Sequence, residues 1–465
     1  MRRLTIILSL LCALTAVLAT AAHASRTQST TLDGPRDLLD AGARPKALDD
    51  VTSLGVKSLR IVLTWQGVAP DSASRVKPKF DATDPGAYDW SRYDALVDAA
   101  QQKGWKVLMT PSGPTPRWAT NGAKDTVTRP SPNEFRMFVQ AAATHFSSKV
   151  DTWSIWNEPN QPQFLGPQYS ARHNPLSPRI YRSLFFAAVR GLRNAGQGAK
   201  PVLIGETSPR GTGKVVPPLT FLRGALCLDA KYRKSKKCAA VPAAGYAHHA
   251  YTTGQGPTFH PPQPNDVTIG VLSRLTSALS KAKRAGATKI TLPIWLTEFG
   301  IESTPDPLRG VSLQKQSEYR SISERIAYDN SRVVSFNQYL LRDDLPKQGV
   351  PKVLRYPGFE TGLFTSAGKA KPSFDGFRLP LVAWRRGGRI SLWGFVRPAG
   401  GATKATVEIS SNGGRTWRTL STYTTDARGY FTRTVSNAKG RQWRLTWTAP
   451  GGTVYHGSAT RAYSR

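Results

Sequence analysis

The chain has 465 residues, of which 39% are hydrophobic and 20% are charged, so it can build a full core and is not largely disordered. The length allows about three ordinary domains, or fewer if one of them is an α/β barrel. Lysine and arginine number 64 against 30 acidic residues, and the net charge of +34 suits polyanions such as nucleic acid, anionic lipid or an acidic polysaccharide.

The first 24 residues have the layout of a secretory signal peptide. Arg2 and Arg3 form a short basic start, residues 4–19 are almost continuously apolar, and residues 22–24 (AHA) fit the cleavage pattern. The alternative, a membrane-spanning helix, needs about 20 apolar residues, and this run is a little short. We therefore predict an exported chain with no transmembrane segment, for which nucleic acid is not the expected partner.

Cleavage after residue 24 would remove Cys12 and leave Cys227 and Cys238. Two cysteines in an exported chain are expected to form a disulfide, with two free thiols as the alternative. Five basic residues lie between them. In the chain-entropy picture, closing so short a loop contributes about 2–3 kcal/mol.

Residues 30–379 alternate short apolar runs with longer amphipathic stretches. The predicted strands are residues 30–32, 56–63, 105–110, 152–156, 201–205, 245–250, 294–297 and 333–341. Helices are predicted over residues 93–103, 131–146 (with Ser131 as N-cap), 180–194, 266–285 and 313–329. About eight strand–helix alternations predict a parallel (β/α)₈ barrel. A doubly wound open sheet is the alternative, but no glycine-rich dinucleotide motif follows the first strand.

From residue 380 onward the apolar runs are short and separated by glycine-rich turns. Strands are predicted over residues 390–396, 405–410, 416–424, 430–435, 441–448 and 453–455. Six or seven short antiparallel strands predict a β-sandwich of the immunoglobulin or fibronectin type III kind. The predicted organisation is therefore a signal peptide (1–24), a catalytic barrel (25–379) and an accessory sandwich (380–465).

Two glutamates follow predicted barrel strands. Glu158 lies in the run WNEPN after the fourth strand, and Glu298 lies in WLTEFG after the seventh. Active sites of such barrels lie at the C-terminal strand ends, so these carboxylates are expected to face each other. Facing carboxylates suit glycoside hydrolysis, because one protonates the leaving oxygen while the other attacks the anomeric carbon or activates water. The alternative is that both form ordinary loop ion pairs.

The runs at residues 157–159 (NEP) and 297–300 (TEFG) resemble the two signatures of clan A glycoside hydrolases, most closely families 5 and 39. The resemblance covers the whole predicted barrel. It implies a retaining double displacement with Glu158 as acid/base, Glu298 as nucleophile and Asn157 as hydrogen-bond partner of the sugar 2-hydroxyl. It implies neither a cofactor nor a metal.

Three more residues match positions of the same clan. Arg60 lies where a strand-two arginine stands near the nucleophile, whose pKa a cation lowers. His249 and Tyr251 end the sixth strand, and the resemblance implies that Tyr251 bonds Glu298 with His249 nearby. Residues two apart on a strand share a face, so the preceding His248 points the other way and is expected to be structural.

Tryptophans at strand ends form a further group. Trp65, Trp118 and Trp156 are predicted as platforms on which sugar rings stack, with ordinary core packing as the alternative. Glu206, after the fifth strand, is interpreted as the partner of a cation, with contact to the substrate as the alternative. Many clan members have a tryptophan at the end of strand eight, where this chain has Tyr339, and this departure leaves the sugar open.

We therefore predict an exported retaining glycoside hydrolase that acts on a poly- or oligosaccharide. Two alternatives are a carbohydrate-binding or envelope-binding protein with a relict site, and a transglycosylase that uses the same two glutamates. The sequence leaves linkage, endo or exo action and oligomeric state open.

The positive charge is denser in the C-terminal unit. Residues 380–465 include 14 basic and 2 acidic residues, a net +12 in 86 positions, whereas residues 25–379 have +20 in 355. We predict that this unit holds the enzyme against an anionic surface or envelope polysaccharide through salt-sensitive contacts.

Overall fold

A computed structural model describes residues 25, 27–122, 125–437 and 441–464. The predicted signal peptide lies outside the described residues. Within the described part of the chain, no helix combines the length and the hydropathy needed to cross a membrane.

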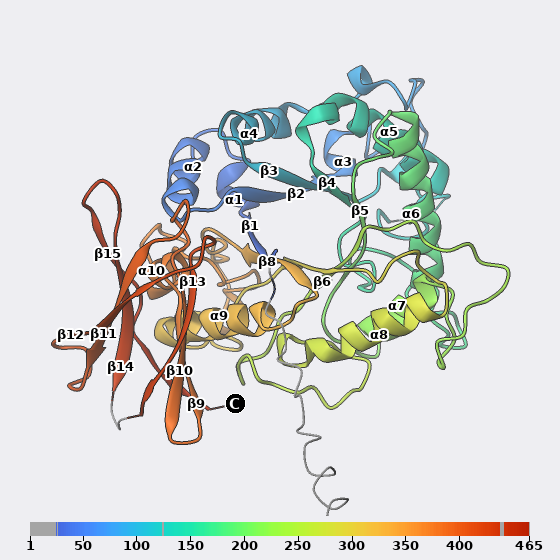
Figure 1. Ribbon diagram of the computed structural model, residues 1–465. Helices are drawn as coiled ribbons and strands as arrows, with labels where there is room; N and C mark the ends of the chain where they lie inside the picture. Colours follow the sequence, from blue (N-terminus) through green and yellow to red (C-terminus); the bar gives the residue numbers. More distant parts are fainter. Residues whose placement is uncertain (1–24, 26, 123–124, 438–440, 465) are drawn as a thin grey trace, which may run out of the picture.

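Eight parallel strands close into a barrel in chain order, with β8 beside β1 (Figure 1). They are β1 (Ser29–Asp33), β2 (Ser58–Thr64), β3 (Lys106–Ser112), β4 (Thr152–Ser154), β5 (Val202–Thr207), β6 (Gly245–His249), β7 (Ile294–Glu298) and β8 (Val333–Tyr339). Most strand residues are buried, because helices cover the outside while side chains fill the inside. The barrel prediction is confirmed, and each predicted strand overlaps an observed one.

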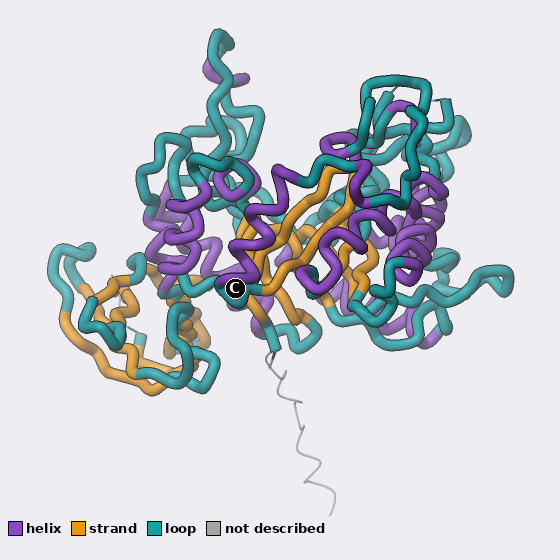
Figure 2. Tube along the Cα trace, turned by 90° about the horizontal axis from the view of Figure 1, so that it is seen from above, coloured by secondary structure: helices purple, strands orange, loops and turns teal. Residues whose placement is uncertain are grey.

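Helices surround the barrel (Figure 2). They are α1 (Pro35–Leu38), α2 (Arg44–Ser53), α3 (Trp65–Val68), α4 (Ser91–Gln102), α5 (Pro132–Phe146), α6 (Ser177–Asn194), α7 (Pro218–Ala225), α8 (Leu272–Arg284), α9 (Leu313–Tyr328) and α10 (Pro372–Arg378). Short 3₁₀ turns occur at η1 (Pro85–Ala87), η2 (Arg117–Ala119), η3 (Ser147–Lys149), η4 (Ile269–Val271) and η5 (Lys352–Leu354). As predicted, the Ser131 hydroxyl caps α5 by accepting from the Glu134 backbone N–H. The helix expected from residue 266 begins only at Leu272, because η4 precedes it.

The C-terminal unit is a curled, mostly antiparallel sheet whose strand order is β12-β11-β14-β16-β9-β10-β13, with β15 beside β14. Its strands are β9 (Leu381–Arg386), β10 (Arg389–Phe395), β11 (Lys404–Ser410), β12 (Arg418–Thr424), β13 (Tyr430–Ser436), β14 (Gln442–Thr448), β15 (Val454–His456) and β16 (Thr460–Tyr463). Buried side chains such as Trp443 and Leu392 form its core, which confirms the β-sandwich fold class. The sequence missed β9, which ends in two arginines, and β16, which is short and polar.

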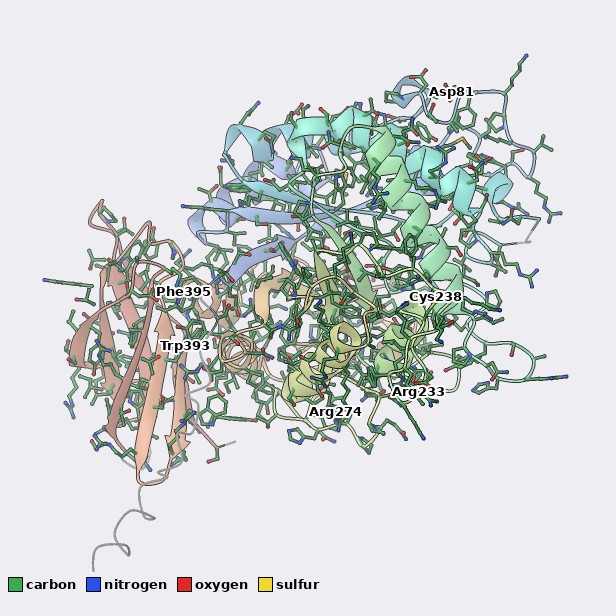
Figure 3. The ribbon with its side chains drawn as sticks, turned by 45° about the vertical axis from the view of Figure 1, so that its right-hand side comes forward. Asp81, Arg233, Cys238, Arg274, Trp393 and Phe395 are labelled. Carbon is green, nitrogen blue, oxygen red and sulfur yellow. A yellow bond between two sulfur atoms is a disulfide. The ribbon has the colours of Figure 1, made fainter. Side chains whose placement is uncertain are left out.

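Helix α9 joins the two units. Ile322 of α9 packs into one apolar cluster with Trp393, Phe395 and Tyr430 of the sandwich. Trp393 and Phe395 lie on the sandwich face turned toward the barrel (Figure 3). Burial of these large rings stabilises the contact between the units. The sandwich is therefore fixed on the barrel rather than tethered by a linker.

A buried ion-pair network reinforces this contact. Glu324 of α9 accepts two hydrogen bonds from Arg397 of the sandwich at 3.0 and 2.8 Å, and one from Arg320 at 2.9 Å. Arg320 also donates to Gln338 of β8 at 2.9 Å. Elsewhere, Cys227 and Cys238 form a disulfide after α7, as predicted.

Candidate active site

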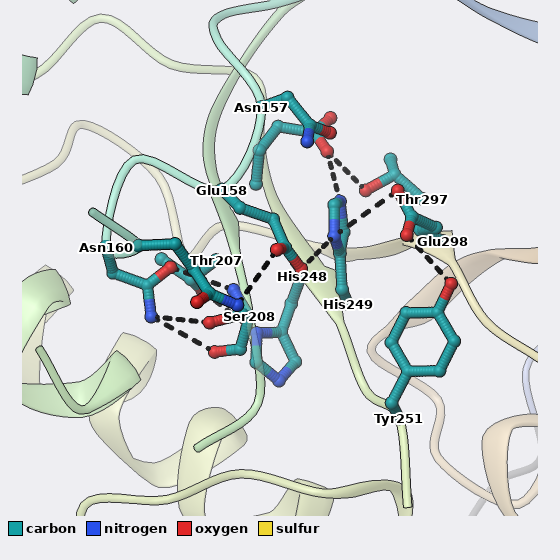
Figure 4. A network of polar contacts seen from close by, with 12 residues as sticks. Asn157, Glu158, Asn160, Thr207, Ser208, His248, His249, Tyr251, Thr297 and Glu298 are labelled. Atoms are coloured by element: carbon teal, nitrogen blue, oxygen red, sulfur yellow. Dashed lines mark hydrogen bonds and ion pairs between the residues drawn. The ribbon is translucent and has the colours of Figure 1, made fainter. Parts of the chain in front are cut away.

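The C-terminal ends of the barrel strands bring a cluster of polar side chains together (Figure 4). The cluster consists of Asp33 of β1, Arg60 of β2, Asn157 and Glu158 after β4, Glu206 of β5, His249 of β6 and Glu298 of β7. All of these except Asn157 are less than 10% exposed. Parallel strands in a closed barrel end on the same side, so residues far apart in sequence meet there.

Arg60 is the centre of the cluster. Its Nη1 donates to Asp33 at 2.8 Å and to Glu298 at 3.0 Å, while its Nη2 donates to Asn157 at 2.7 Å and to Glu206 at 3.1 Å. Burial alone would lower the pKa of Arg60, but the surrounding carboxylates outweigh burial and raise that pKa. The guanidinium therefore stays charged and aligns groups from four other strand ends.

Glu298 is held by two donors. The Tyr251 hydroxyl donates to its Oε1 at 2.8 Å, and Arg60 donates to its Oε2. The pKa of Tyr251 lies well above its usual range because of burial and the nearby Glu298 carboxylate, so the phenol keeps its proton and remains a donor. These two contacts fix the carboxylate at the end of β7.

Glu158 lies opposite Glu298. Its Oε1 contacts His249 Nδ1 at 2.9 Å, and its Oε2 accepts from Gln161 at 3.1 Å. A carboxylate oxygen of Glu158 and one of Glu298 lie within 4.8 Å of each other. Burial raises the pKa of Glu158 although His249 opposes this shift, so the environment favours the protonated acid.

Glu206 lies behind the two facing glutamates and is fully buried. It accepts hydrogen bonds from His249 at 2.7 Å, from Thr297 at 2.9 Å, from Ser154 and from Arg60. Burial opposes ionisation, but the Arg60 guanidinium and the hydrogen bond and charge of His249 outweigh it and lower the pKa of Glu206 to about 2. The interpretation of Glu206 as a cation partner is confirmed.

His249 connects Glu206 with Glu158 through its two ring nitrogens, and its Nδ1 also lies 3.5 Å from Glu298. Burial would lower the pKa of His249, but these three carboxylates raise it to about 10. The ring is therefore an imidazolium at neutral pH. The adjacent His248 instead contacts Thr207 and the Val267 carbonyl, which agrees with its predicted structural role.

The backbone is irregular where these side chains turn inward. Trp156, Glu158 and Glu206 have φ values of 69°, 38° and 50°, a left-handed region that is unfavourable for side chains of this kind. The β5–β6 pairing shifts register at Glu206, and the β6–β7 pairing shifts between Ala247 and His249. Such bulges re-aim side chains, which explains how Glu206 and His249 reach the same point.

The aromatic platforms are only partly where they were expected. Trp65 is a correction, because its ring is fully buried and stacks on Phe138 at 5.3 Å, so it offers no face to a sugar. Trp156 is also fully buried. Trp118 is partly exposed and its Nε1 donates to the Pro70 carbonyl at 3.1 Å. Core packing therefore accounts for two of the three predicted platforms.

Sequence reasoning placed no function on Asp33. Burial raises its pKa to about 6, although Arg60 opposes this shift. The strand-end rule that found Glu158 and Glu298 applies equally to Asp33, the last residue of β1, and would have included it.

Glu158, His249 and Glu298 are close enough together for one metal ion to contact all three. In this site, however, Arg60 and the protonated His249 already supply positive charge to the carboxylates. We therefore assign no metal to them.

The family model "Cellulase (glycosyl hydrolase family 5)" matches residues 40–333. No curated protein sequence matches the chain.

Several solved structures share the fold at low sequence identity. A family 39 glycoside hydrolase from Bacteroides cellulosilyticus WH2 is 16% identical with a TM-score of 0.52, over 90% of this chain and 81% of that one. A monomeric beta-xylosidase from Caulobacter crescentus CB15 is 16% identical with a TM-score of 0.53, over 91% and 97%. The GH39 enzyme from Xanthomonas axonopodis pv. citri is 15% identical with a TM-score of 0.51, over 91% and 94%.

Proposed function

Because the chain belongs to glycosyl hydrolase family 5, we propose that it hydrolyses a glycosidic bond with retention of anomeric configuration, using Glu298 as nucleophile and Glu158 as acid/base. One observation carries this proposal. Retaining enzymes have carboxylates about 5–5.5 Å apart, whereas inverting enzymes leave about 6.5–9.5 Å for a water. Oxygens of Glu158 and Glu298 lie within 4.8 Å, which supports the retaining arrangement.

In the first step, Glu298 attacks the anomeric carbon while the bond to the leaving oxygen breaks. Glu158 gives its proton to that oxygen, and a glycosyl ester on Glu298 remains. The raised pKa of Glu158 suits this role, since the acid must start protonated. Tyr251 and Arg60 hold Glu298 in place for the attack.

In the second step, Glu158 takes a proton from a water molecule, which attacks the same carbon and releases Glu298. The protonated His249 stabilises the Glu158 carboxylate that forms between the two steps. The Oδ1 of Asn157 accepts a hydrogen bond from Arg60, and none of the described residues accepts from its amide N–H groups, so these groups can donate to the sugar 2-hydroxyl.

The test uses Glu158→Gln and Glu298→Gln on an aryl glycoside that the wild type cleaves, with aryl β-glucosides and β-xylosides screened first. Each variant should lose about a hundredfold to ten thousandfold in kcat/KM. Glu158→Gln removes the proton donor, and Glu298→Gln removes the nucleophile that forms the covalent bond. Gln161→Ala is a matched control that removes only a neighbour of Glu158 and should retain most activity.

The stereochemical claim has a separate measurement. NMR of the first-formed product should show the anomer of the substrate. An inverted product, or near-wild-type turnover in either glutamate variant, would contradict the proposal. Transfer of the glycosyl group to an added sugar instead of water would identify a transglycosylase that uses the same two residues.

A further inference from the structure

Two loops at the catalytic end of the barrel expose large aliphatic side chains. One loop follows β7 and exposes Leu308 (70%), and the other follows β8 and exposes Leu345 (67%), Val353 (48%) and Leu354 (58%). In the described part of the chain, the other exposed large hydrophobics are Val76, Ile290 and Val454, which lie in three separate segments. Four of the seven exposed large hydrophobics of the described residues thus lie in two loops, and such a concentration marks an interaction surface more often than scattered residues do.

Hydrogen bonds hold these two loops together. Arg309, next to Leu308, donates to the Gly358 carbonyl at 2.9 Å. The β8 loop is closed on itself by a bond from the Lys347 N–H to the Arg355 carbonyl at 2.8 Å. The four exposed aliphatic residues therefore belong to one joined pair of loops, which we call the loop patch.

The loop patch is also basic. Lys347, Lys352 and Arg355 are exposed, and none of the described residues pairs with their side chains. The five acidic residues of the same loops face internal partners or are buried. Asp306 binds Arg309 at 2.9 Å, Asp344 accepts from the Phe359 N–H at 2.9 Å, and Glu302 accepts from the Glu360 N–H at 2.8 Å. Asp343 pairs with the buried Lys371 at 2.6 Å, and Glu360 is itself buried. The exposed lysine and arginine side chains therefore belong to the same loops as the exposed leucines, while the acidic side chains of these loops bind internal partners.

Exposed aliphatic side chains beside exposed cations suit one kind of partner. Aliphatic side chains enter the boundary between headgroups and acyl chains, while lysine and arginine reach the anionic headgroups. A polysaccharide is instead bound by flat aromatic rings, whereas the exposed large hydrophobic side chains here are aliphatic and the aromatic rings of the same loop, Tyr356 and Phe359, are partly buried. We propose that the loop patch docks the enzyme, catalytic end first, on a lipid bilayer that contains anionic lipid.

Aromatic packing links the β8 loop to the proposed catalytic residues. Phe359, at the base of the β8 loop, packs on Tyr251 at 6.1 Å and on Tyr339 at 5.2 Å between ring centroids. Tyr251 in turn bonds Glu298. Docking would therefore bring the mouth of the site to the membrane surface, where it would meet glycans that lie on or are attached to that surface.

The test measures binding of the full chain to vesicles by co-sedimentation. Vesicles of phosphatidylcholine alone are compared with vesicles of phosphatidylcholine and phosphatidylglycerol in equal parts. We expect binding only with the anionic lipid. The pair Lys352→Gln and Arg355→Gln should weaken it about thirtyfold, since each cation near such a surface contributes a factor of about five. The pair Val353→Ser and Leu354→Ser should also weaken it.

Matched controls separate docking from general charge attraction. Arg389→Gln with Arg418→Gln removes the same charge from exposed sandwich positions, and Val76→Ser with Val454→Ser removes two exposed aliphatic side chains elsewhere. Both controls should change binding less than twofold, with thermal midpoints confirming that every variant folds. Equal loss in the sandwich control, or no binding to the anionic vesicles, overturns the proposal. Unchanged binding when the loop patch is altered overturns it as well. Because binding is measured without turnover, these outcomes are independent of the proposed function.

Discussion

Two clusters of buried charged residues in this chain have opposite compositions. At the strand ends, the cation Arg60 contacts three carboxylates, those of Asp33, Glu206 and Glu298. Between barrel and sandwich, the carboxylate of Glu324 lies between two arginines. Both clusters are almost fully buried, so burial alone does not distinguish a catalytic cluster from a structural one.

The two clusters differ in how far their charges are compensated by neighbouring groups. Arg320 and Arg397 also have aromatic rings and polar partners around them, and they close the interface. The strand-end cluster has excess negative charge and two facing carboxylates about 7–8% exposed. A positively charged, oxocarbenium-like transition state fits such a site, since it supplies the missing positive charge.

Arg60→Gln should have the largest effect, because it removes the only arginine in the strand-end cluster. The carboxylates of Asp33, Glu206 and Glu298 would then repel one another without the guanidinium between them. We expect a loss of about 3–5 kcal/mol in the free energy of unfolding and at least a hundredfold in kcat/KM. Urea titration and turnover of an aryl glycoside measure the two effects. Wild-type turnover in the folded variant would show that catalysis does not need Arg60.

Glu324→Gln tests the other cluster. It leaves Arg320 and Arg397 without their shared carboxylate, which should also cost about 3–5 kcal/mol of stability. Turnover per folded molecule should stay within about twofold, because Glu324 does not contact the strand-end cluster. Asp329→Asn breaks the more exposed pair with Arg325 on the same helix and should cost less than about 1 kcal/mol. A large fall in kcat for Glu324→Gln would show that the sandwich also positions the site.

Glu206→Gln should have a smaller effect that depends on pH. The pKa of Glu206 is lowered from its usual 4.5 to about 2, so its stabilisation is complete above pH 4.5 and is lost as the pH falls toward 2. The difference in unfolding free energy between wild type and variant should therefore shrink by about 3 kcal/mol over that window. Glu134→Gln, in a partly exposed pair with Lys77, serves as the control. A difference that stays constant with pH would contradict this assignment.

The position of the sandwich also changes how its charge can be tested. Deleting residues 380–465 would expose Ile322 of α9 and leave Glu324 facing Arg320 alone, so lost retention could reflect damage to the barrel. Substitution of exposed arginines such as Arg389 and Arg418 tests the predicted attachment to an envelope polysaccharide without that damage. The same pair serves as the control for the loop patch, so one experiment compares the two basic surfaces.

The sequence by itself determined the barrel, the sandwich, the disulfide and the strand-end position of Glu158 and Glu298. The barrel, the sandwich and the two glutamates follow from apolar periodicity and from residues next to strand ends, which are local in the chain. The disulfide follows from the two cysteines that an exported chain would keep. The sequence also pointed to Arg60, His249 and Tyr251, because these residues match positions of clan A glycoside hydrolases. For Arg60 alone, an arginine inside an apolar strand also indicated a buried partner.

Only the tertiary structure decided how these residues are paired. That Arg60 contacts four partners, and that His249 connects Glu206 with Glu158, depends on the closure of the barrel and on bulges in β5 and β6. Packing also decided that Trp65 belongs to the core and that the β8 loop exposes its leucine and valine side chains. Burial, partner charge and exposure depend on residues far apart in sequence, and local pattern does not contain that information.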